Sequence, residues 1–258
     1  MTRFPETDED VAVAISMQFL AEKIFEPSLY GAVPQYSEIL QVIIRSMGDY
    51  CSPIRDDYST RAWSAEAWSA ILAHPDYMTV RENQCKVLAD NLFDRIAILC
   101  PQDKAEAFKG DLLEKCIKPA VALCEKFHTS LHKFHLKGSS LLFFGHGKKV
   151  RYLENFYASP DDMICINVLQ NRKTLHLPKE SSAHDGRALQ RQVHPVGAVL
   201  PALYLQKAQR NENDPQEPIV VCKQKALVAY GLSAEWKRYK DAAERTLASK
   251  LLAIRIGI

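Results

Sequence analysis

The sequence predicts a mainly α-helical protein, in which an N-terminal helical bundle precedes an α+β C-terminal half with short strands. Two observations lead to this fold class. Between residues 8 and 136, apolar residues recur at intervals of three and four in segments that Pro or Gly residues separate. After residue 138 this helical period ends, and short apolar runs and alternating apolar residues follow. The composition, with 47% hydrophobic and 25% charged residues, is that of an ordinary globular chain.

Residues 8–136 are expected to form a bundle of five or six helices. In the first helix, Val13, Met17 and Leu20 lie on one face, and Pro27 ends the pattern. Pro119 must kink or restart the last helix, because its ring removes a backbone N–H donor. The helical patterns cover residues 8–26, 37–49, 60–73, 79–100 and 103–131. The side chains predicted to be buried are Trp63, Trp68, Leu92, Phe93 and Leu113.

The fourth helical pattern has the clearest predicted start. Thr79 is followed three residues later by Glu82, which is the spacing of a capping box. In that motif the Thr hydroxyl accepts a hydrogen bond from the third helical N–H, and the Glu carboxylate accepts one from the cap residue. The fourth helix is therefore expected to begin at Thr79.

The C-terminal half is expected to contain short strands joined by polar loops. Ile164, Ile166 and Val168 alternate with Cys165 and Asn167, as in a strand with two different faces. Further strands are expected at 219–222 and 226–230, and a final helix after residue 233. The predicted domains are a helical bundle over residues 1–137 and a basic α+β region over 138–258, with one continuous domain as the alternative.

The net charge of +2 hides a strong asymmetry between the two halves of the chain. Residues 1–125 hold 12 basic and 20 acidic side chains, a net charge of −8, and residues 126–258 hold 21 and 11, a net charge of +10. Residues 126–153 contain no acidic side chain. Two interpretations are open: the basic half binds an anionic surface, or it docks on the acidic half of the same chain.

The anionic-surface interpretation names a candidate site. Basic side chains in this stretch can contact phosphates or anionic headgroups, and aromatic residues are interleaved with them. Gly138, Gly145 and Gly147 would let the chain turn back, so that basic residues on either side of them converge. The predicted exposed patch consists of Lys133, Lys137, Lys148, Lys149 and Arg151.

The stretch also contains a weak candidate for a metal site. His128, His132 and His135 follow one another at i, i+4 and i+7, and would share one face if the segment were helical. The motif HExxH is absent, because Thr129 and Ser130 follow the first histidine. Three solvated histidines are therefore the favoured interpretation, and the sequence predicts no metal and no other cofactor. Walker and GxSxG motifs are also absent from the sequence.

One segment resembles a known family. The apolar run 193–203 ends in Pro201-Ala202-Leu203, and after a polar gap a strand-like run contains Lys223-Gln224-Lys225-Ala226. This arrangement resembles the C-terminal domain of mitochondria-eating protein over about 40 residues. It departs from that pattern in having Leu200, not an aromatic residue, before Pro201, and in a longer gap at 206–218. The resemblance implies a non-enzymatic helical module that works at mitochondria with anionic lipid.

The sequence as a whole favours a non-catalytic interaction module over an enzyme. The expected partner is a protein or an anionic lipid; the alternatives are a nucleic-acid-binding module and an enzyme without a recognisable motif. Seven cysteines without a CxxC pair are expected to be free thiols, which suits a cytoplasmic location, peripheral to mitochondria if the resemblance holds. The longest apolar run, 196–205, is too short to span a bilayer. The oligomeric state is open.

Overall fold

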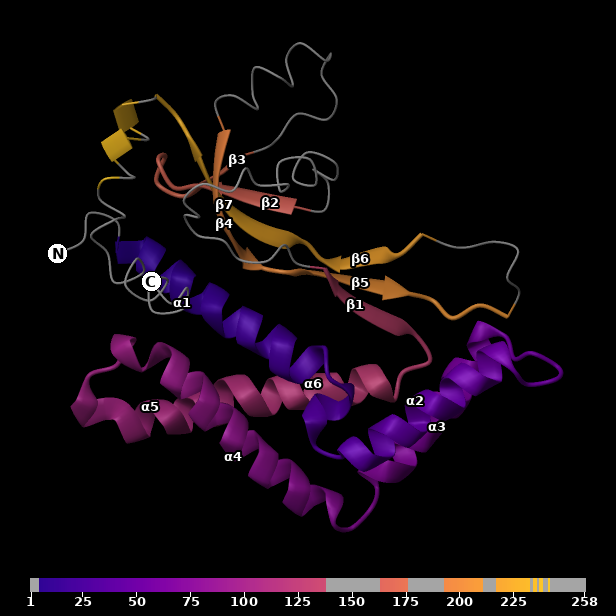
Figure 1. Cartoon of the computed structure of the whole chain (residues 1–258). Coiled ribbons are helices and arrows are strands. Elements are labelled where there is room, and N and C mark those ends of the chain that lie inside the picture. The colour runs from indigo at the N-terminus through magenta and orange to yellow at the C-terminus, as the bar shows by residue number, and fades with distance from the viewer. Residues whose placement is uncertain are drawn as a thin grey trace, which may run out of the picture. The chain divides into compact units, whose positions relative to one another are not determined.

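The computed structural model describes residues 5–137, 163–175, 193–210 and 217–232, together with residues 234, 235, 237, 238 and 241. Its described part has helices in the N-terminal half and short strands in the C-terminal half, so the predicted class, mainly α with an N-terminal helical bundle followed by an α+β half, is confirmed (Figure 1). The chain divides into two compact units. We call Phe19–Leu136 with Tyr204–Ile219 the helical unit, and Met1–Gln18, Lys137–Leu203 and Val220–Ile258 the sheet unit.

The helices follow the predicted pattern closely, with shifts of a few residues at their ends. Short π or 3-10 turns, at Ala21–Phe25, Ser28–Gly31, Ala97–Leu99, Gln102–Lys104 and Leu113–Ile117, connect or extend them. Pro119 lies in the first turn of a new helix, as predicted, because a proline there costs no intrahelical hydrogen bond. The α-helices are α1 (Pro5–Leu20), α2 (Pro34–Asp49), α3 (Asp57–Leu72), α4 (Tyr77–Ile96), α5 (Ala105–Leu112) and α6 (Lys118–His128).

The helical unit buries two of the five side chains that are predicted to be buried. Trp68 is 2% exposed and Leu92 is fully buried, as predicted. Trp63, Phe93 and Leu113 are only partly buried, so that part of the prediction is wrong. On a helix, side chains five residues apart point in directions that differ by about 140°, and adjacent side chains in directions that differ by about 100°. Trp63 and Trp68 therefore cannot both point into the core, and neither can Leu92 and Phe93.

Two helix boundaries differ from the predictions. Helix α4 begins at Tyr77, and its N-cap, Asp76, makes no side-chain capping hydrogen bond; the predicted capping box at Thr79 is therefore wrong. A side-chain cap occurs instead on α3, where Asp56 Oδ1 accepts a hydrogen bond from Ser59 N at 2.7 Å. Helix α6 ends at His128, and the segment Lys133–Lys137, predicted to lie in the bundle, forms a strand.

The strands in the described ranges form two sheets. One has three strands in the order β1-β5-β6, and the other has four in the order β3-β2-β7-β4. In the four-stranded sheet, β7 lies between a parallel neighbour, β2, and an antiparallel neighbour, β4. The strands are β1 (Lys133–Lys137), β2 (Met163–Asn167), β3 (Lys173–Leu175), β4 (Val193–Leu200), β5 (Ala202–Gln206), β6 (Ile219–Cys222) and β7 (Gln224–Tyr230).

The core of the sheet unit lies around the middle of β7. Ala226 and Val228 pack there with Cys165 and Val193 from the neighbouring strands. Asn167 is 1% exposed and ends the β2–β7 ladder with its side chain: Nδ2 donates to Tyr230 O at 2.8 Å, and Oδ1 accepts from Tyr230 N at 3.0 Å. A buried amide side chain is stable only when paired in this way. Of the helices in the described ranges, none has the length and apolar character to cross a membrane.

Candidate functional site

The structure places two of the five predicted basic residues together. Lys133 and Lys137 lie on the exposed face of β1, with His135 between them, whereas Phe134 and Leu136 are partly buried. At about 3.3 Å per residue, the two lysines are roughly 13 Å apart along the strand. Lys148, Lys149 and Arg151 lie outside the described residues. The predicted patch is therefore represented by a basic row, Lys133-His135-Lys137, on one strand.

Aromatic packing orients the first residues of β1 within the helical unit. The ring of Phe134 stacks on Phe127 of α6, with centroids 4.3 Å apart and planes inclined by 10°. Phe127 also contacts Phe25, at 5.7 Å. Because alternate strand residues point to opposite faces, fixing Phe134 inward fixes Lys133 and His135 outward. The aromatic residues of the basic stretch that the structure describes thus serve packing, while its charges face solvent.

The three histidines do not share a helix face, so the geometry considered for a metal site is wrong. His128 is in the last turn of α6, His132 is in the following bend, and His135 is on β1. The helix ends because the chain turns there into the strand. In the part of the chain that the structure describes, no group of three His, Cys, Asp or Glu side chains could hold a metal ion.

His128 has a structural role instead. Its Nε2 accepts a hydrogen bond from Leu29 N at 3.2 Å, and its ring lies 5.2 Å from that of Trp68. Burial, together with the nearby Arg61 guanidinium, lowers the pKa of His128 to about 4. The imidazole is therefore neutral at physiological pH, as an acceptor from a backbone N–H must be.

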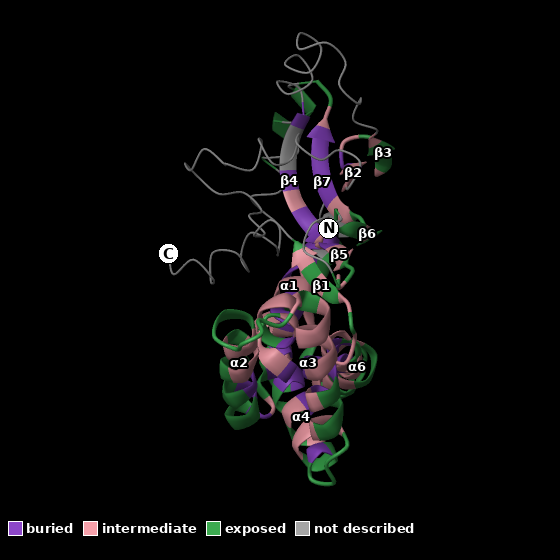
Figure 2. Ribbon diagram, turned by 90° about the vertical axis from the view of Figure 1, so that its right-hand side faces the viewer, coloured by how far each residue is buried: buried purple, intermediate pink, exposed green. Residues whose placement is uncertain are grey.

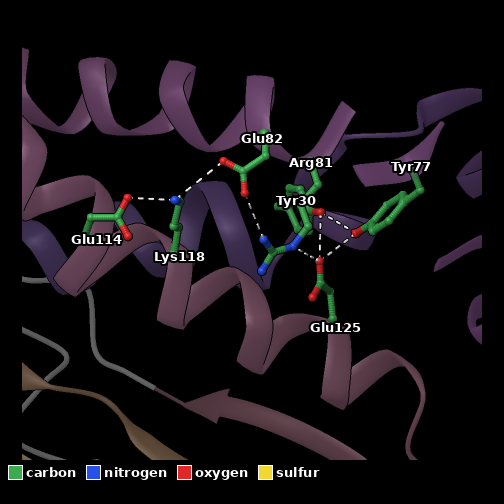
Figure 3. Close-up of polar contacts among 7 residues, drawn as sticks. All are labelled: Tyr30, Tyr77, Arg81, Glu82, Glu114, Lys118 and Glu125. Carbon is green, nitrogen blue, oxygen red and sulfur yellow. Dashed lines mark hydrogen bonds and ion pairs between the residues drawn. The ribbon is translucent and has the colours of Figure 1, made fainter. Parts of the chain in front are cut away.

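The most connected polar group of the helical unit is Glu125, on α6. Its Oε1 accepts hydrogen bonds from Tyr77 Oη and Arg81 Nε, both at 2.8 Å, and from Tyr30 Oη at 3.1 Å (Figure 3). The two tyrosine oxygens also contact each other; because each hydroxyl has a single proton, the two tyrosines supply two protons to these three oxygen–oxygen contacts. These four residues, Tyr30, Tyr77, Arg81 and Glu125, form what we call the Glu125 cluster.

The cluster connects three separate elements, and its polar groups bind one another. Tyr30 comes from the turn Ser28–Gly31, Tyr77 and Arg81 from α4, and Glu125 from α6. Burial raises the pKa of both tyrosines, so each keeps the proton that it donates. The carboxylate oxygen that could act as a base already has three donors, and this arrangement favours a structural role.

A chain of ion pairs continues from the cluster to the surface. Arg81 Nη1 lies 3.6 Å from Glu82 Oε1, and Lys118 Nζ lies 3.6 Å from Glu82 Oε2 (Figure 3). Lys118 Nζ also contacts Glu114 Oε1 at 2.7 Å. The charges alternate in sign along this chain, so each group has a neighbour of opposite charge.

The cysteines show the character of packed apolar side chains. All seven are free, and Cys85, Cys124 and Cys165 are buried. Burial raises the pKa of both Cys124 and Cys165 to about 12, so these thiols stay protonated at neutral pH. A protonated thiol is a poor nucleophile.

A hollow of about 280 Å³ lies elsewhere, between Leu99 and Asp111, with Lys104 and Asp111 as its charged lining residues.

The feature that sequence reasoning missed is the outward face of α2. Its apolar side chains Tyr36, Ile39 and Val42 are 46%, 58% and 64% exposed, and Tyr50 at its C-cap is 79% exposed. Figure 2 shows most of this helix as exposed. Ile54, 65% exposed, lies close to its last turn, because Arg55 N donates to Met47 O at 3.2 Å. We call Tyr36, Ile39, Val42, Ile43 and Tyr50 the α2 face.

A signal for this face was present in the sequence. Apolar residues occupy more than half of the circumference of α2, whereas a helix that packs on one side needs a stripe only slightly wider than 100°. Leu40 takes the inward side and is 8% exposed. The surplus apolar residues therefore had to face outward.

No known protein family, no curated protein and no solved structure matches this chain. The segment that resembles the C-terminal domain of mitochondria-eating protein forms β4, β5, β6 and the first part of β7. That resemblance stays a prediction.

Replacing Glu125 with Leu should lower the free energy of unfolding by about 3–5 kcal/mol, because it leaves the Arg81 charge and two tyrosine hydroxyls without their shared acceptor. Urea denaturation followed by circular dichroism measures this. The control is Glu114→Gln, at a side chain that is 59% exposed and where the loss should stay below about 1 kcal/mol. Equal losses in the two variants would contradict a central role for the cluster.

The neutral His128 should make stability depend on pH. Its folded-state pKa of about 4 lies below its ordinary value of 6.5, so the unfolded chain binds the proton more tightly. The stabilisation is complete above pH 6.5 and is lost as the pH falls towards 4, by roughly 2–3 kcal/mol. His128→Gln keeps an acceptor for Leu29 N and should remove this part of the pH dependence, whereas His74→Gln, at an exposed histidine, should not.

Proposed function

We propose that this chain is a non-catalytic interaction module whose helical unit binds a protein partner through the α2 face. The observation that carries the proposal is the exposure of three large apolar side chains on one side of α2, Tyr36, Ile39 and Val42, and of Tyr50 at its C-cap. Contiguous exposed apolar patches are uncommon on monomeric proteins and mark interaction sites. The face also contains two tyrosines, Tyr36 and Tyr50, a residue type that is enriched in protein interfaces.

Burial of the α2 face by a binding partner would be energetically favourable. The five exposed side chains Tyr36, Ile39, Val42, Tyr50 and Ile54 offer on the order of 600 Å² of surface, close to the roughly 800 Å² per partner of a standard interface. Apolar area buried at about 25 cal/mol per Å² would contribute strongly to binding. Anchors at i, i+3 and i+7, as in Tyr36, Ile39 and Ile43, are typical of helix recognition.

The basic row supports a second function, docking on an anionic surface. Lys133, His135 and Lys137 point to solvent from one strand face, within the acid-free stretch 126–153. Anionic lipid is the surface we propose, and the resemblance to the C-terminal domain of mitochondria-eating protein makes mitochondrial membranes the first to test. Nucleic acid is the alternative, because phosphates attract the same side chains.

A photo-crosslinking residue at Val42 should form a discrete adduct in cells, because this position lies on the α2 face and is 64% exposed. The same residue at Asp94, an exposed position on α4, should not. Adding Ile39→Glu should reduce the Val42 adduct at least ten-fold without changing the melting temperature. Adducts of equal yield at Val42 and Asp94 would argue against the α2 face as a binding surface.

Lys133→Glu/Lys137→Glu should weaken binding to phosphatidylserine vesicles at least about thirty-fold, since each lysine near an anionic membrane contributes about 1 kcal/mol. The control Lys86→Glu/Lys115→Glu makes the same change of charge at exposed positions away from β1. Vesicle flotation at fixed salt measures this. Equal effects of the two double variants would remove the basic row as the site, and tighter binding to duplex DNA than to vesicles would favour nucleic acid.

A further inference from the structure

We infer that the hollow beside α5 binds a small aromatic carboxylate, with the ring of the ligand against Phe108 and its carboxylate at Lys104. We call this site the α5 hollow; its lining residues are Leu99, Cys100, Pro101, Lys104, Ala107, Phe108 and Asp111. It shares no residue with the α2 face or the basic row, so this inference goes beyond the proposed function and is tested independently of it.

The α5 hollow lies between one helix face and the connection that precedes the helix. Four of its lining residues recur at i, i+3, i+4 and i+7, the spacing of a single helix face: Lys104, Ala107, Phe108 and Asp111. The opposite wall is Leu99–Pro101. In that segment Cys100 has an extended backbone between two 3-10 turns, where the chain passes from α4 to α5.

The apolar wall of the α5 hollow is held in place without a ligand. The Phe108 ring packs edge-on against Phe93, with centroids 6.2 Å apart and planes inclined by 61°. Lys109 Nζ lies over the same Phe93 ring, 4.9 Å from its centroid. Ala107, next to Phe108, is exposed and has only a methyl group, so the space beside the ring stays open. Sites for small molecules are commonly preformed in this way, apolar with few polar groups.

The size of the α5 hollow suits a single ring with a short substituent. Its volume of about 280 Å³ lies just below the roughly 300 Å³ at which pockets for drug-sized ligands begin. It is nearly twice the volume of about 150 Å³ that is sufficient for benzene. Two of the lining groups favour an aromatic ligand: the Phe108 ring can pair with a second ring, and the Cys100 sulfur can contact its edge.

The charges at the α5 hollow favour an anion at one end. Asp111 Oδ1 lies 2.8 Å from Lys115 Nζ, so the acidic lining residue already has a cation. In the part of the chain that the structure describes, the Lys104 side chain has no ion pair and no hydrogen bond. Lys104 and Phe108 are four residues apart, about 6 Å along the helix axis. A ligand that reaches both therefore has two or three carbon atoms between its ring and its carboxylate.

Phenylpropionate should bind the full-length chain with a Kd on the order of 1 mM, as expected for a ligand of this size in an open hollow. Saturation-transfer-difference NMR measures this. Ala107→Leu should weaken binding at least ten-fold by filling the hollow, and should leave the circular dichroism unchanged, because Ala107 is exposed and Leu is a good helix former. The matched control is Ala70→Leu, at an exposed alanine of α3, which should bind as the wild type does.

A second comparison tests the charge and the ring. Lys104→Gln should weaken phenylpropionate binding about five-fold, the effect of one exposed ion pair, and should leave binding of the neutral analogue phenylpropanol unchanged. Lys86→Gln, at an exposed lysine of α4, should change neither. Octanoate, which has the carboxylate but no ring, should bind less tightly than phenylpropionate to the wild-type chain.

Four outcomes would overturn the inference or one of its parts. Unchanged binding in Ala107→Leu would remove the α5 hollow as the site. Equal loss of phenylpropanol and phenylpropionate in Lys104→Gln would remove the charge contact, and tighter binding of octanoate would remove the aromatic class. No saturation transfer at about 10 mM phenylpropionate, ten times the expected Kd, would overturn the inference as a whole. None of these results changes the Val42 crosslink that tests the proposed function.

Discussion

One carboxylate oxygen determines how the helical unit is assembled. Glu125 Oε1, on α6, accepts hydrogen bonds from two tyrosines and one arginine that reach it from the turn Ser28–Gly31 and from α4. A buried charge of this kind is tolerated only when its donors are already in place. The turn Ser28–Gly31 and helix α4, which supply these donors, must therefore have defined positions relative to α6. The polar side chains of the Glu125 cluster are thereby paired with one another.

The same constraint explains the unusual backbone near residue 30. Leu29 and Tyr30 have positive φ angles of 43° and 44°, which residues other than glycine rarely adopt. Such a conformation persists where the surroundings over-determine it. Here Tyr30 is held by Glu125 and Tyr77, and Leu29 N by His128 Nε2. Helix α6 thus fixes this turn through two side chains one helical turn apart, Glu125 and His128.

Two surfaces, the α2 face and the outer face of β1, present side chains that the interior does not bury. The α2 face leaves large apolar side chains exposed, and β1 turns its lysines outward because Phe134 turns inward. These two surfaces differ in chemistry, one apolar and one cationic, so each suits a different class of partner. Both are consistent with the interaction module that we propose.

The sequence by itself determined the fold class, most helix limits and the restart at Pro119, because these depend on local periodicity and on the missing N–H of proline. It could not decide which of Trp63 and Trp68 would face the core, nor that α6 would end at His128 and release His132 and His135 from a common face. Those outcomes depend on contacts over about 100 residues in sequence, such as Leu29 with His128. The exposure of the α2 face also belongs to tertiary structure: the pattern showed a surplus of apolar residues, but only the packing of Leu40 inward decided which of them face solvent.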